Sequence, residues 1–272
     1  MKQEIFEIAE NEMIADGIWR MAMYGDTSAI VRPGQFVNIK LDGMFLRRPI
    51  SVCDWMPEGT ASSGVLGIIY KVVGHGTDAM SELKKGDRLD VLTGLGNGYD
   101  MSLAGKRPVL IGGGVGVPPL YGLAKRLVFR GSPVDVILGF NSMSEAFYVE
   151  EFDALNDMYD FGCEGFEGER PRVKVHLATA DGSAGTKGFV TSCIDDVDAC
   201  SHYYACGPIP MLKALVPAME EHFPGVTGSL SLEERMGCGF GACVGCSIMT
   251  GSGPKKVCSD GPVFESDDII LK

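Results

Sequence analysis

Long apolar runs are missing from this sequence: none approaches the roughly 20 residues that a membrane-spanning helix needs, so no membrane partner is expected. Positive charge is also scarce, with 24 Lys and Arg against 36 Asp and Glu and a formal net charge of −12. A nucleic-acid partner is not expected either, because no basic surface is available to neutralise phosphates. The N-terminus lacks the charged and apolar regions of a secretory signal, which favours a cytoplasmic location.

Also missing is the even spread of cysteines that a disulfide framework would show in a short secreted chain. Nine cysteines occur, and four of them fall in the last 35 residues. This clustering indicates a reducing compartment and a metal site. With 45% hydrophobic residues, the 272-residue chain can bury two cores and carry a small appendage, at roughly 100–150 residues per domain.

Residues 1–100 have the pattern of an antiparallel β-barrel or sandwich. Short, partly alternating apolar stretches are separated by turn sequences such as Arg32-Pro33-Gly34 and Lys85-Gly86-Asp87. Many short strands with regular turns are typical of these folds. We predict strands at Glu4–Ala9, Ile18–Met23, Gln35–Ile39, Val65–Val72 and Arg88–Leu92.

Strands alternate with helices over residues 101–224, and this alternation indicates a doubly wound parallel sheet. We predict strands Arg107–Ile111, Val134–Gly139, Val173–Ala178 and Ser201–Ala205, and helices Pro118–Phe129, Val149–Met158 and Met211–His222. Residues 225–272 are rich in Gly and Cys and show little periodicity, so a metal is expected to supply their order. The sequence therefore predicts a multidomain β plus α/β protein with an N-terminal barrel, a nucleotide-binding α/β domain and a C-terminal Cys-rich segment.

Four C-terminal cysteines have a spacing that points to a metal cluster. Cys238, Cys243, Cys246 and Cys258 follow C-x4-C-x2-C-x11-C, and a plant-type [2Fe–2S] ferredoxin loop has the same first intervals and a distant fourth Cys. The surrounding glycines allow positive φ angles that bring the backbone close to the sulfurs. Structural zinc is the competing interpretation, although zinc sites tend to use paired CxxC arms and here one loop carries three ligands. We predict a ferredoxin-like [2Fe–2S] segment with these four ligands.

Two short elements of the N-terminal domain suit the diphosphate of a flavin. In Arg48-Pro49-Ile50-Ser51, between two predicted strands, the guanidinium can pair with phosphate oxygens in two places and the proline keeps the segment extended. Taken alone, this segment favours an edge-strand turn that carries a surface arginine. The second element, Ile69-Tyr70-Lys71 followed by Gly76-Thr77, places backbone N–H groups at the start of a predicted helix, Asp78–Leu83. Together the two elements predict a cradle for FAD.

Two elements of the α/β domain suit a nicotinamide dinucleotide. The turn Gly112-Gly113-Gly114-Val115-Gly116 supplies bare backbone before a helix, although it departs from the G-x-G-x-x-G fingerprint. Cys206-Gly207-Pro208 follows the last predicted strand, and the carboxyl ends of such strands face the ligand crevice. We assign Cys206 as the candidate catalytic residue, because a small thiol there could orient the nicotinamide C4 for hydride transfer. A buried structural Cys is the alternative, and this is how we interpret Cys53, Cys163, Cys193 and Cys200.

No basic pair follows the second strand of this domain, near Gly139-Phe140-Asn141, to hold a 2′-phosphate. This favours NAD, and the choice between NAD and NADP stays open.

With these residues identified, the chain resembles the electron transfer subunits of dihydroorotate dehydrogenase B, a family within the ferredoxin–NADP reductase-like superfamily. The resemblance covers essentially the full length. It rests on Arg48–Ser51, Gly112–Pro119, Tyr204–Pro208 and, most specifically, on the stretch from Glu233 through the four cysteines to Phe264.

This resemblance implies an oxidoreductase subunit of pyrimidine biosynthesis with FAD, a [2Fe–2S] cluster and NAD. Electrons would come from an FMN-containing catalytic subunit, pass the cluster one at a time and reach FAD, which would transfer a hydride to NAD⁺. The family also implies a heterotetramer of two plus two subunits. Consistent with this division of labour, the sequence shows no Ser/His/Asp or paired-carboxylate constellation that would process a substrate.

Two other functions remain open on the sequence. The first is a reductase subunit of a related NADH-dependent ferredoxin–NADP or sulfide oxidoreductase complex, which would keep the cofactors and change the partner. Four cysteines, with no acidic residue in place of the first, favour the dihydroorotate function. The second is a zinc-stabilised binding protein on a reductase-like scaffold, which would be colourless when purified.

Overall fold

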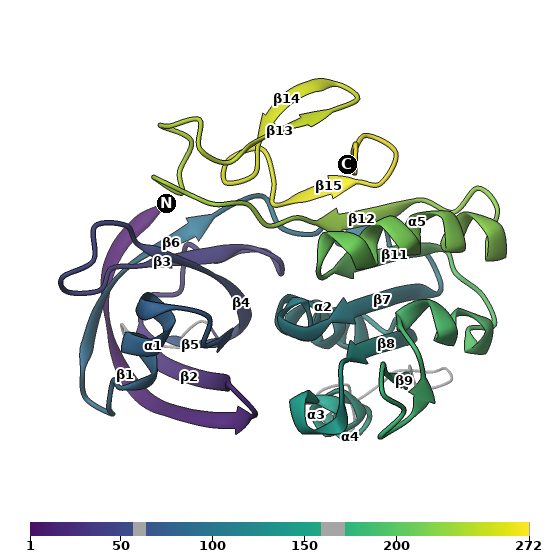
Figure 1. The fold of residues 1–272 in the computed structure, drawn as a ribbon, viewed down its shortest axis with the longest axis horizontal. Helices are drawn as coiled ribbons and strands as arrows, with labels where there is room; N and C mark the ends of the chain where they lie inside the picture. The colour runs from purple at the N-terminus through teal and green to yellow at the C-terminus, as the bar shows by residue number, and fades with distance from the viewer. Residues whose placement is uncertain (57–63, 159–171, 272) are drawn as a thin grey trace. The chain divides into compact units, whose positions relative to one another are not determined.

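The structure, a computed structural model, describes residues 1–56, 64–158 and 172–271 (Figure 1). Contacts divide the chain into two compact units, which we describe one at a time. The first, the barrel unit, comprises Met1–Tyr99 and Leu232–Val263. The second, the nucleotide unit, comprises Asp100–Ser231 and Phe264–Lys272. The sequence predicted three segments, residues 1–100, 101–224 and 225–272, each defined by the cofactor that it binds. A division by contacts does not test which cofactor a segment binds.

The barrel unit is built on a closed antiparallel barrel with strand order β1-β2-β5-β4-β3-β6. Its strands are β1 (Lys2–Ala15), β2 (Ile18–Gly25), β3 (Phe36–Ile39), β4 (Arg48–Met56), β5 (Gly64–Lys71) and β6 (Arg88–Leu95). Side chains of alternating strand positions point inward, as the two-residue period of a strand requires. Phe6 and Ile8 of β1, for example, meet Met21 and Met23 of β2 in the buried core, and Ile8 pairs directly with Met23.

A short helix, α1 (His75–Ser81), follows β5 and packs Met80 into the barrel core. The C-terminal part of the barrel unit, residues 232–263, holds the hairpin of β13 (Ser247–Thr250) and β14 (Gly253–Lys256). This part is closed at its base by a hydrogen bond from the Leu232 N–H to the Pro262 carbonyl, 2.9 Å. It is also joined to the end of β6, because the Asn97 N–H donates to the Gly261 carbonyl at 2.8 Å.

The nucleotide unit contains a seven-stranded sheet of order β10-β9-β8-β7-β11-β12-β15. The pairs from β10 through β12 are parallel. The strands are β7 (Pro108–Gly113), β8 (Val134–Phe140), β9 (Val173–Thr179), β10 (Thr186–Lys187), β11 (His202–Cys206), β12 (Gly228–Ser231) and β15 (Val263–Glu265). Their apolar side chains are buried almost continuously, as expected for a parallel sheet that is covered on both faces.

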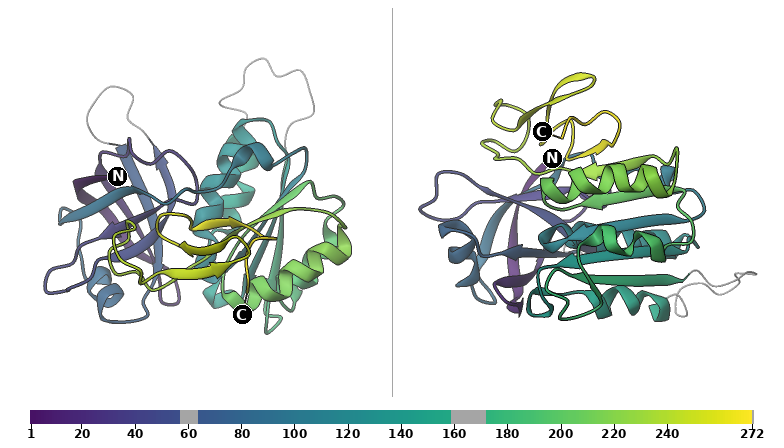
Figure 2. Two further views of the ribbon diagram at one scale, coloured as in Figure 1. Left: turned by 90° about the horizontal axis from the view of Figure 1, so that it is seen from above. Right: turned by 45° about the vertical axis from the view of Figure 1, so that its right-hand side comes forward.

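Helices cover the two faces of this sheet: the teal helices lie on one face and the green helices on the other (Figure 2). The α-helices are α2 (Pro118–Phe129), α3 (Val149–Asp153), α4 (Leu155–Met158) and α5 (Ile209–His222). The 3-10 helices are η1 (Met101–Leu103), η2 (Gly114–Gly116), η3 (Met143–Glu145) and η5 (Val190–Asp196). Among the described helices, none combines the length and the apolar character that crossing a membrane requires.

The barrel and the doubly wound sheet confirm the predicted fold class. Three local predictions differ. Arg48–Ser51, predicted to lie between strands, forms the first half of β4 because Phe36–Ile39 pair with it. The helix expected at Asp78–Leu83 begins at His75, because the Thr77 hydroxyl accepts the Val73 N–H at 2.9 Å and caps an earlier turn.

The third difference concerns the C-terminal residues. Their sequence shows little periodicity and no strand was predicted there, yet they contribute β12 and β15 to the nucleotide sheet and the β13–β14 hairpin to the barrel unit. These strands have only three or four residues each, too few to show a clear period in the local sequence.

Candidate functional site

The four predicted metal ligands are brought together as two pairs of thiols. The Sγ atoms of Cys246 and Cys258 are 3.2 Å apart, and both residues are buried. Cys238 and Cys243 exchange backbone contacts: the Cys243 N–H donates to the Cys238 sulfur at 3.3 Å, and the Cys238 N–H donates to the Cys243 sulfur at 3.5 Å. The Phe240 N–H also donates to the Cys238 sulfur, at 3.5 Å.

These surroundings shift the acidity of two of the thiols in opposite directions. Burial acts to raise the pKa of Cys238, but the backbone N–H groups of Cys243 and Phe240 outweigh it and lower that pKa to about 6. Burial, and then the adjacent Cys246 thiol, raise the pKa of Cys258 to about 12. A metal that binds Cys258 must therefore displace the proton from its thiol.

Glycines and one lysine shape the loop around the first pair. Gly239 and Gly241 have φ of +78° and +90°, a region that residues with a Cβ rarely adopt. The Lys256 ammonium donates to the Gly241 carbonyl at 2.6 Å and ties the loop to β14. The Val257 N–H donates to the Cys246 carbonyl at 3.0 Å, which brings the fourth predicted ligand, Cys258, close to the third, Cys246.

The chemistry of this donor set fits an iron–sulfur cluster. Four thiols in two pairs, with backbone N–H groups directed at the sulfurs, provide two ligands for each of two irons. Within the described residues, no group of three or more His, Cys, Asp and Glu side chains is arranged around one metal-ion position.

The two predicted flavin elements also converge. A Cβ added to Gly76 would collide with the Arg48 guanidinium, so this side chain lies directly over the first turn of α1. The same guanidinium donates to the Leu46 carbonyl at 2.7 Å. The Thr77 hydroxyl is engaged in the helix cap, and this leaves the backbone N–H groups of the first turn as the donors that face outward.

The remaining flavin candidates lie on neighbouring strands. Pro49, Ile50 and Ser51 are paired with β3, opposite Asn38, Val37 and Phe36 respectively. Tyr70 points into the barrel core, where its hydroxyl donates to Asn11 Oδ1 at 3.0 Å and burial raises its pKa to about 12. Ile69 and Lys71, on either side of it, face the other way because side chains alternate along a strand.

The two predicted nicotinamide elements meet at the carboxyl ends of adjacent parallel strands. Cys206, the last residue of β11, is paired with Gly112 of β7. A Cβ added to Gly116 would collide with the Cys206 carbonyl, and a Cβ added to Gly207 would lie 3.2 Å from the Gly113 nitrogen. Close backbone approach therefore requires glycine at position 116 and leaves little room for a side chain at position 207.

A cavity of about 390 Å³ opens beside these glycines, within the nucleotide unit. Gly113, Gly114 and Pro208 line it. The sequence did not assign its other lining residues: Gly139, Phe140, Asn141, Glu145, Phe189, Val190, Thr191, Pro210, Met211 and Ala214. None of these described lining residues is Lys or Arg. Among these residues, Phe189 is 71% exposed and offers an open aromatic face.

Comparison with known proteins identifies the family. Residues 233–270 match the iron–sulfur cluster binding domain of dihydroorotate dehydrogenase B, and residues 110–216 match the oxidoreductase NAD-binding domain. The chain is 40% identical over its full length to the electron transfer subunit of dihydroorotate dehydrogenase B (NAD⁺) of Bacillus pumilus, 99% of which is covered. The corresponding Fusobacterium nucleatum subunit is 42% identical, with both chains fully covered.

The chain belongs to the family of dihydroorotate dehydrogenase B electron transfer subunits.

Solved structures agree with the fold of this family. An NADH-dependent reduced ferredoxin–NADP oxidoreductase, studied for flavin-based electron bifurcation, superposes with a TM-score of 0.80 at 28% identity and covers 98% of this chain and 90% of its own. The cytochrome b5 reductase domain of Ulva prolifera nitrate reductase has a TM-score of 0.63 at 20% identity, with 84% of this chain and 97% of its own covered. The latter shows the shared fold alone.

Membership of the electron transfer subunit family confirms the predicted iron–sulfur, FAD and NAD cofactors and the oxidoreductase class. The relatives are named as an electron transfer subunit, and this name implies a catalytic partner subunit. The eight cysteines that the structure describes form no disulfide. Cys163 lies outside the described residues.

Proposed function

We propose that this chain is the electron transfer subunit of an NAD-dependent dihydroorotate dehydrogenase and passes electrons from an FMN-containing catalytic subunit to NAD⁺ in pyrimidine biosynthesis. The observation that supports it most directly is the placement of the two thiol pairs in the same compact unit as Arg48 and Gly76. A cluster and a flavin held by one compact unit can keep a fixed separation, which electron transfer needs.

The residues of the barrel unit have distinct roles in this proposal. Arg48 and the first turn of α1, with Gly76 and Thr77, would hold the FAD diphosphate. Pro49, Ile50 and Ser51 on β4, and Ile69, Tyr70 and Lys71 on β5, would border the flavin. Cys238, Cys243, Cys246 and Cys258 would hold the cluster. When bound, FAD converts between the one-electron chemistry of the cluster and the two-electron chemistry of a nicotinamide.

The nucleotide unit would position NAD. Gly112, Gly113, Gly114 and Gly116 leave the backbone bare for a pyrophosphate, and Gly207 and Pro208 lie beside them at the end of β11. Cys206 would orient the nicotinamide ring. The cavity offers Glu145 and Asn141, and among the described residues that line it there is no cation for a 2′-phosphate, which supports NAD over NADP.

The partner would be the FMN-containing catalytic subunit, in a heterotetramer of two plus two subunits. The absence of disulfides among the described cysteines is compatible with the reducing cytoplasm, where we place the complex. The three functional segments would be an FAD-binding barrel at residues 1–100, an NAD-binding domain at 101–224 and a cluster-binding segment at 225–272.

The isolated subunit, purified without oxygen, tests this function. We expect one FAD and two irons per chain, oxidation of NADH with ferricyanide, and no reduction of orotate. Addition of the FMN-containing catalytic subunit should couple dihydroorotate oxidation to NAD⁺ reduction. A colourless protein, or orotate turnover by this chain alone, would contradict the proposal.

A reductase subunit of an NADH-dependent ferredoxin–NADP oxidoreductase is the second candidate, favoured by the structural likeness at 28% identity. This alternative predicts the same colour and the same NADH oxidation, but no coupling to dihydroorotate when the catalytic subunit is added. Reduction of a ferredoxin by NADH would support it.

A further inference from the structure

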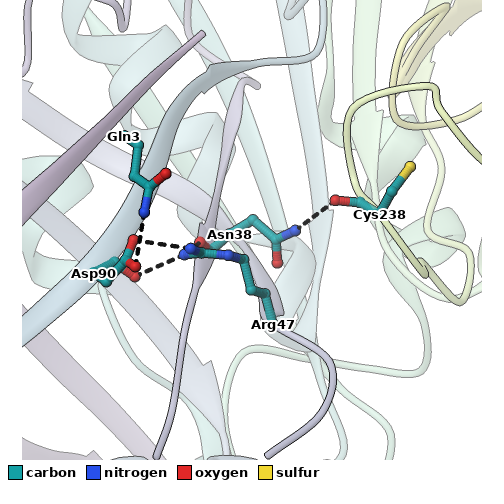
Figure 3. Close-up of polar contacts among 5 residues, drawn as sticks. All are labelled: Gln3, Asn38, Arg47, Asp90 and Cys238. Carbon is teal, nitrogen blue, oxygen red and sulfur yellow. Dashed lines mark hydrogen bonds and ion pairs between the residues drawn. The ribbon is translucent and has the colours of Figure 1, made fainter.

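Asn38 of β3 contacts the first cluster ligand directly. Its side-chain Nδ2 donates a hydrogen bond to the main-chain carbonyl of Cys238 at 3.2 Å (Figure 3). Asn38 is only 1% exposed, so water does not compete for this bond. The contact joins the barrel to the cluster loop although the two residues are 200 positions apart in the sequence.

The strand that carries Asn38, β3, pairs directly with β4, the strand that carries the proposed flavin segment Arg48–Ser51. In the β3–β4 register, Asn38 is opposite Pro49 and Ile39 is opposite Arg48. A continuous route of covalent and hydrogen bonds therefore runs from the Cys238 backbone through Asn38 to the proposed flavin segment.

A rigid network fixes the backbone of Asn38. Arg47 donates to the Asn38 carbonyl at 3.2 Å and to the Asp90 carbonyl and carboxylate, each at 2.9 Å. The Gln3 side-chain amide donates to Oδ2, the second carboxylate oxygen of Asp90, at 2.9 Å (Figure 3). The two consecutive arginines thus differ in role: Arg47 holds β3 in place, and Arg48 lies over α1.

The loop side of the contact is equally constrained. Gly239, immediately after the ligand, has φ of +78°, and a Cβ there would collide with Asn38 Nδ2. Asn38 Oδ1 is one of two buried side-chain atoms among the described residues that lack a hydrogen-bond partner. An unpartnered buried acceptor is unfavourable for stability. The presence of an amide at this buried position is therefore best explained by the hydrogen bond that its Nδ2 donates to Cys238.

We propose that Asn38 is a positioning residue that holds the Cys238 edge of the cluster at a fixed place relative to the flavin segment and so sets the rate of electron transfer between the two cofactors. This rests on the proposed function, because it needs both cofactors in the barrel unit. Loss of one hydrogen bond lowers the ratio of anchored to released loop by about fivefold, the factor that corresponds to about 1 kcal/mol.

The test follows anaerobic reduction of the loaded subunit by NADH in a stopped-flow instrument, with separate wavelengths for flavin and cluster. In Asn38→Ala, flavin reduction should stay within about twofold of wild type, and the subsequent cluster reduction should slow by about fivefold. The electron paramagnetic resonance spectrum of the reduced cluster should broaden, because the Cys238 edge is held less uniformly. Asn38→Asp keeps the shape of the side chain and replaces the N–H donor by an oxygen, so it should slow cluster reduction in the same way as Asn38→Ala.

Two further variants separate positioning from a general loss of stability. Gly239→Ala disrupts the same hydrogen bond from the loop side, because its methyl group collides with Asn38 Nδ2. Cluster reduction in the double variant, Asn38→Ala with Gly239→Ala, should be no slower than in the slower of the two single variants. Asn156→Ala is the matched control, because it removes an amide that bonds the Val173 carbonyl and N–H at 3.1 and 2.8 Å in the nucleotide unit. Its cluster reduction should match wild type.

Unchanged cluster reduction and an unchanged resonance spectrum in both Asn38 variants would overturn the role proposed for Asn38 and would leave the proposed function of the chain standing. Failure of these variants to bind iron would also overturn it, since Asn38 would then act in assembly. A wild-type subunit without a cluster, or one that NADH cannot reduce, would instead overturn the proposed function itself.

Discussion

Acidification should weaken the nucleotide unit through one buried histidine. His202 on β11 is 1% exposed, and its two ring nitrogens are hydrogen-bonded to the hydroxyls of Thr227 and Ser229, each at 2.9 Å. Burial lowers the pKa of His202 from 6.5 to about 4, because the charged ring would lose its hydration inside the sheet.

The folded chain loses stability on acidification because the unfolded chain binds a proton at His202 at a higher pH than the folded chain does. Below pH 6.5 the unfolded chain takes up a proton at this ring, whereas the folded chain does so only near pH 4. The contribution of His202 to stability is therefore complete above pH 6.5 and declines as the pH falls. At about 1.4 kcal/mol per pKa unit, the loss between pH 7.5 and pH 5 is about 2 kcal/mol.

A neighbouring carboxyl works in the opposite direction. Burial raises the pKa of Glu265, whose Oε1 accepts from the Ser229 hydroxyl at 3.2 Å. Its contribution is present at low pH and is lost as the pH rises through the folded pKa, so it offsets part of the histidine effect. Comparison of a His202 variant with wild type at each pH removes this shared term.

Hydrogen exchange of peptides that span β11 and β12 measures the effect locally. Wild-type protection should fall between pH 7.5 and pH 5 by more than that of His202→Gln, with a difference of about 2 kcal/mol in the opening free energy. His222→Gln provides a control of opposite sign, because the Ala218 carbonyl and Asp195 raise the pKa of that exposed ring. Equal pH dependence in wild type and His202→Gln would refute the reasoning.

Three substitutions test the cofactor sites. Cys243→Ser should abolish the cluster signal in electron paramagnetic resonance of the reduced protein, and an unaltered signal would remove this residue from the ligand set. Gly76→Ala should weaken FAD binding by about tenfold because its methyl group displaces the Arg48 guanidinium. Gly74→Ala, with open space around the added methyl, should leave the FAD dissociation constant unchanged, and equal affinities in the two variants would argue against the clash. Gly116→Ala should lower kcat/KM for NADH by about tenfold through its collision at the end of β11 while the cluster signal persists, and an unaffected kcat/KM would place the nicotinamide elsewhere.

Local patterns carried most of the information on the fold and the cysteine site. The helix Pro118–Phe129 is where its periodicity and its N-terminal prolines predict it. The cysteine spacing predicted four candidate ligands because those residues are close in sequence, and the structure brings them together as two pairs. Asn38 could not be found in this way, since its role depends on a partner 200 residues distant. Phe189 and Glu145 were missed for the same reason: strand ends far apart in the chain assemble the cavity that they line.

The path of the chain between the two units determines when the cluster site can form. The barrel unit is complete only after residues 232–263, yet the chain must first build most of the nucleotide sheet and must afterwards return to it as β15. During synthesis, the first 99 residues therefore emerge without the hairpin and the thiols that belong to them. Because the four predicted ligands lie at residues 238–258, a cluster bound by them can form only after nearly the entire polypeptide is made, and a chain cut after Ser231 would lose a sheet strand together with all four predicted ligands.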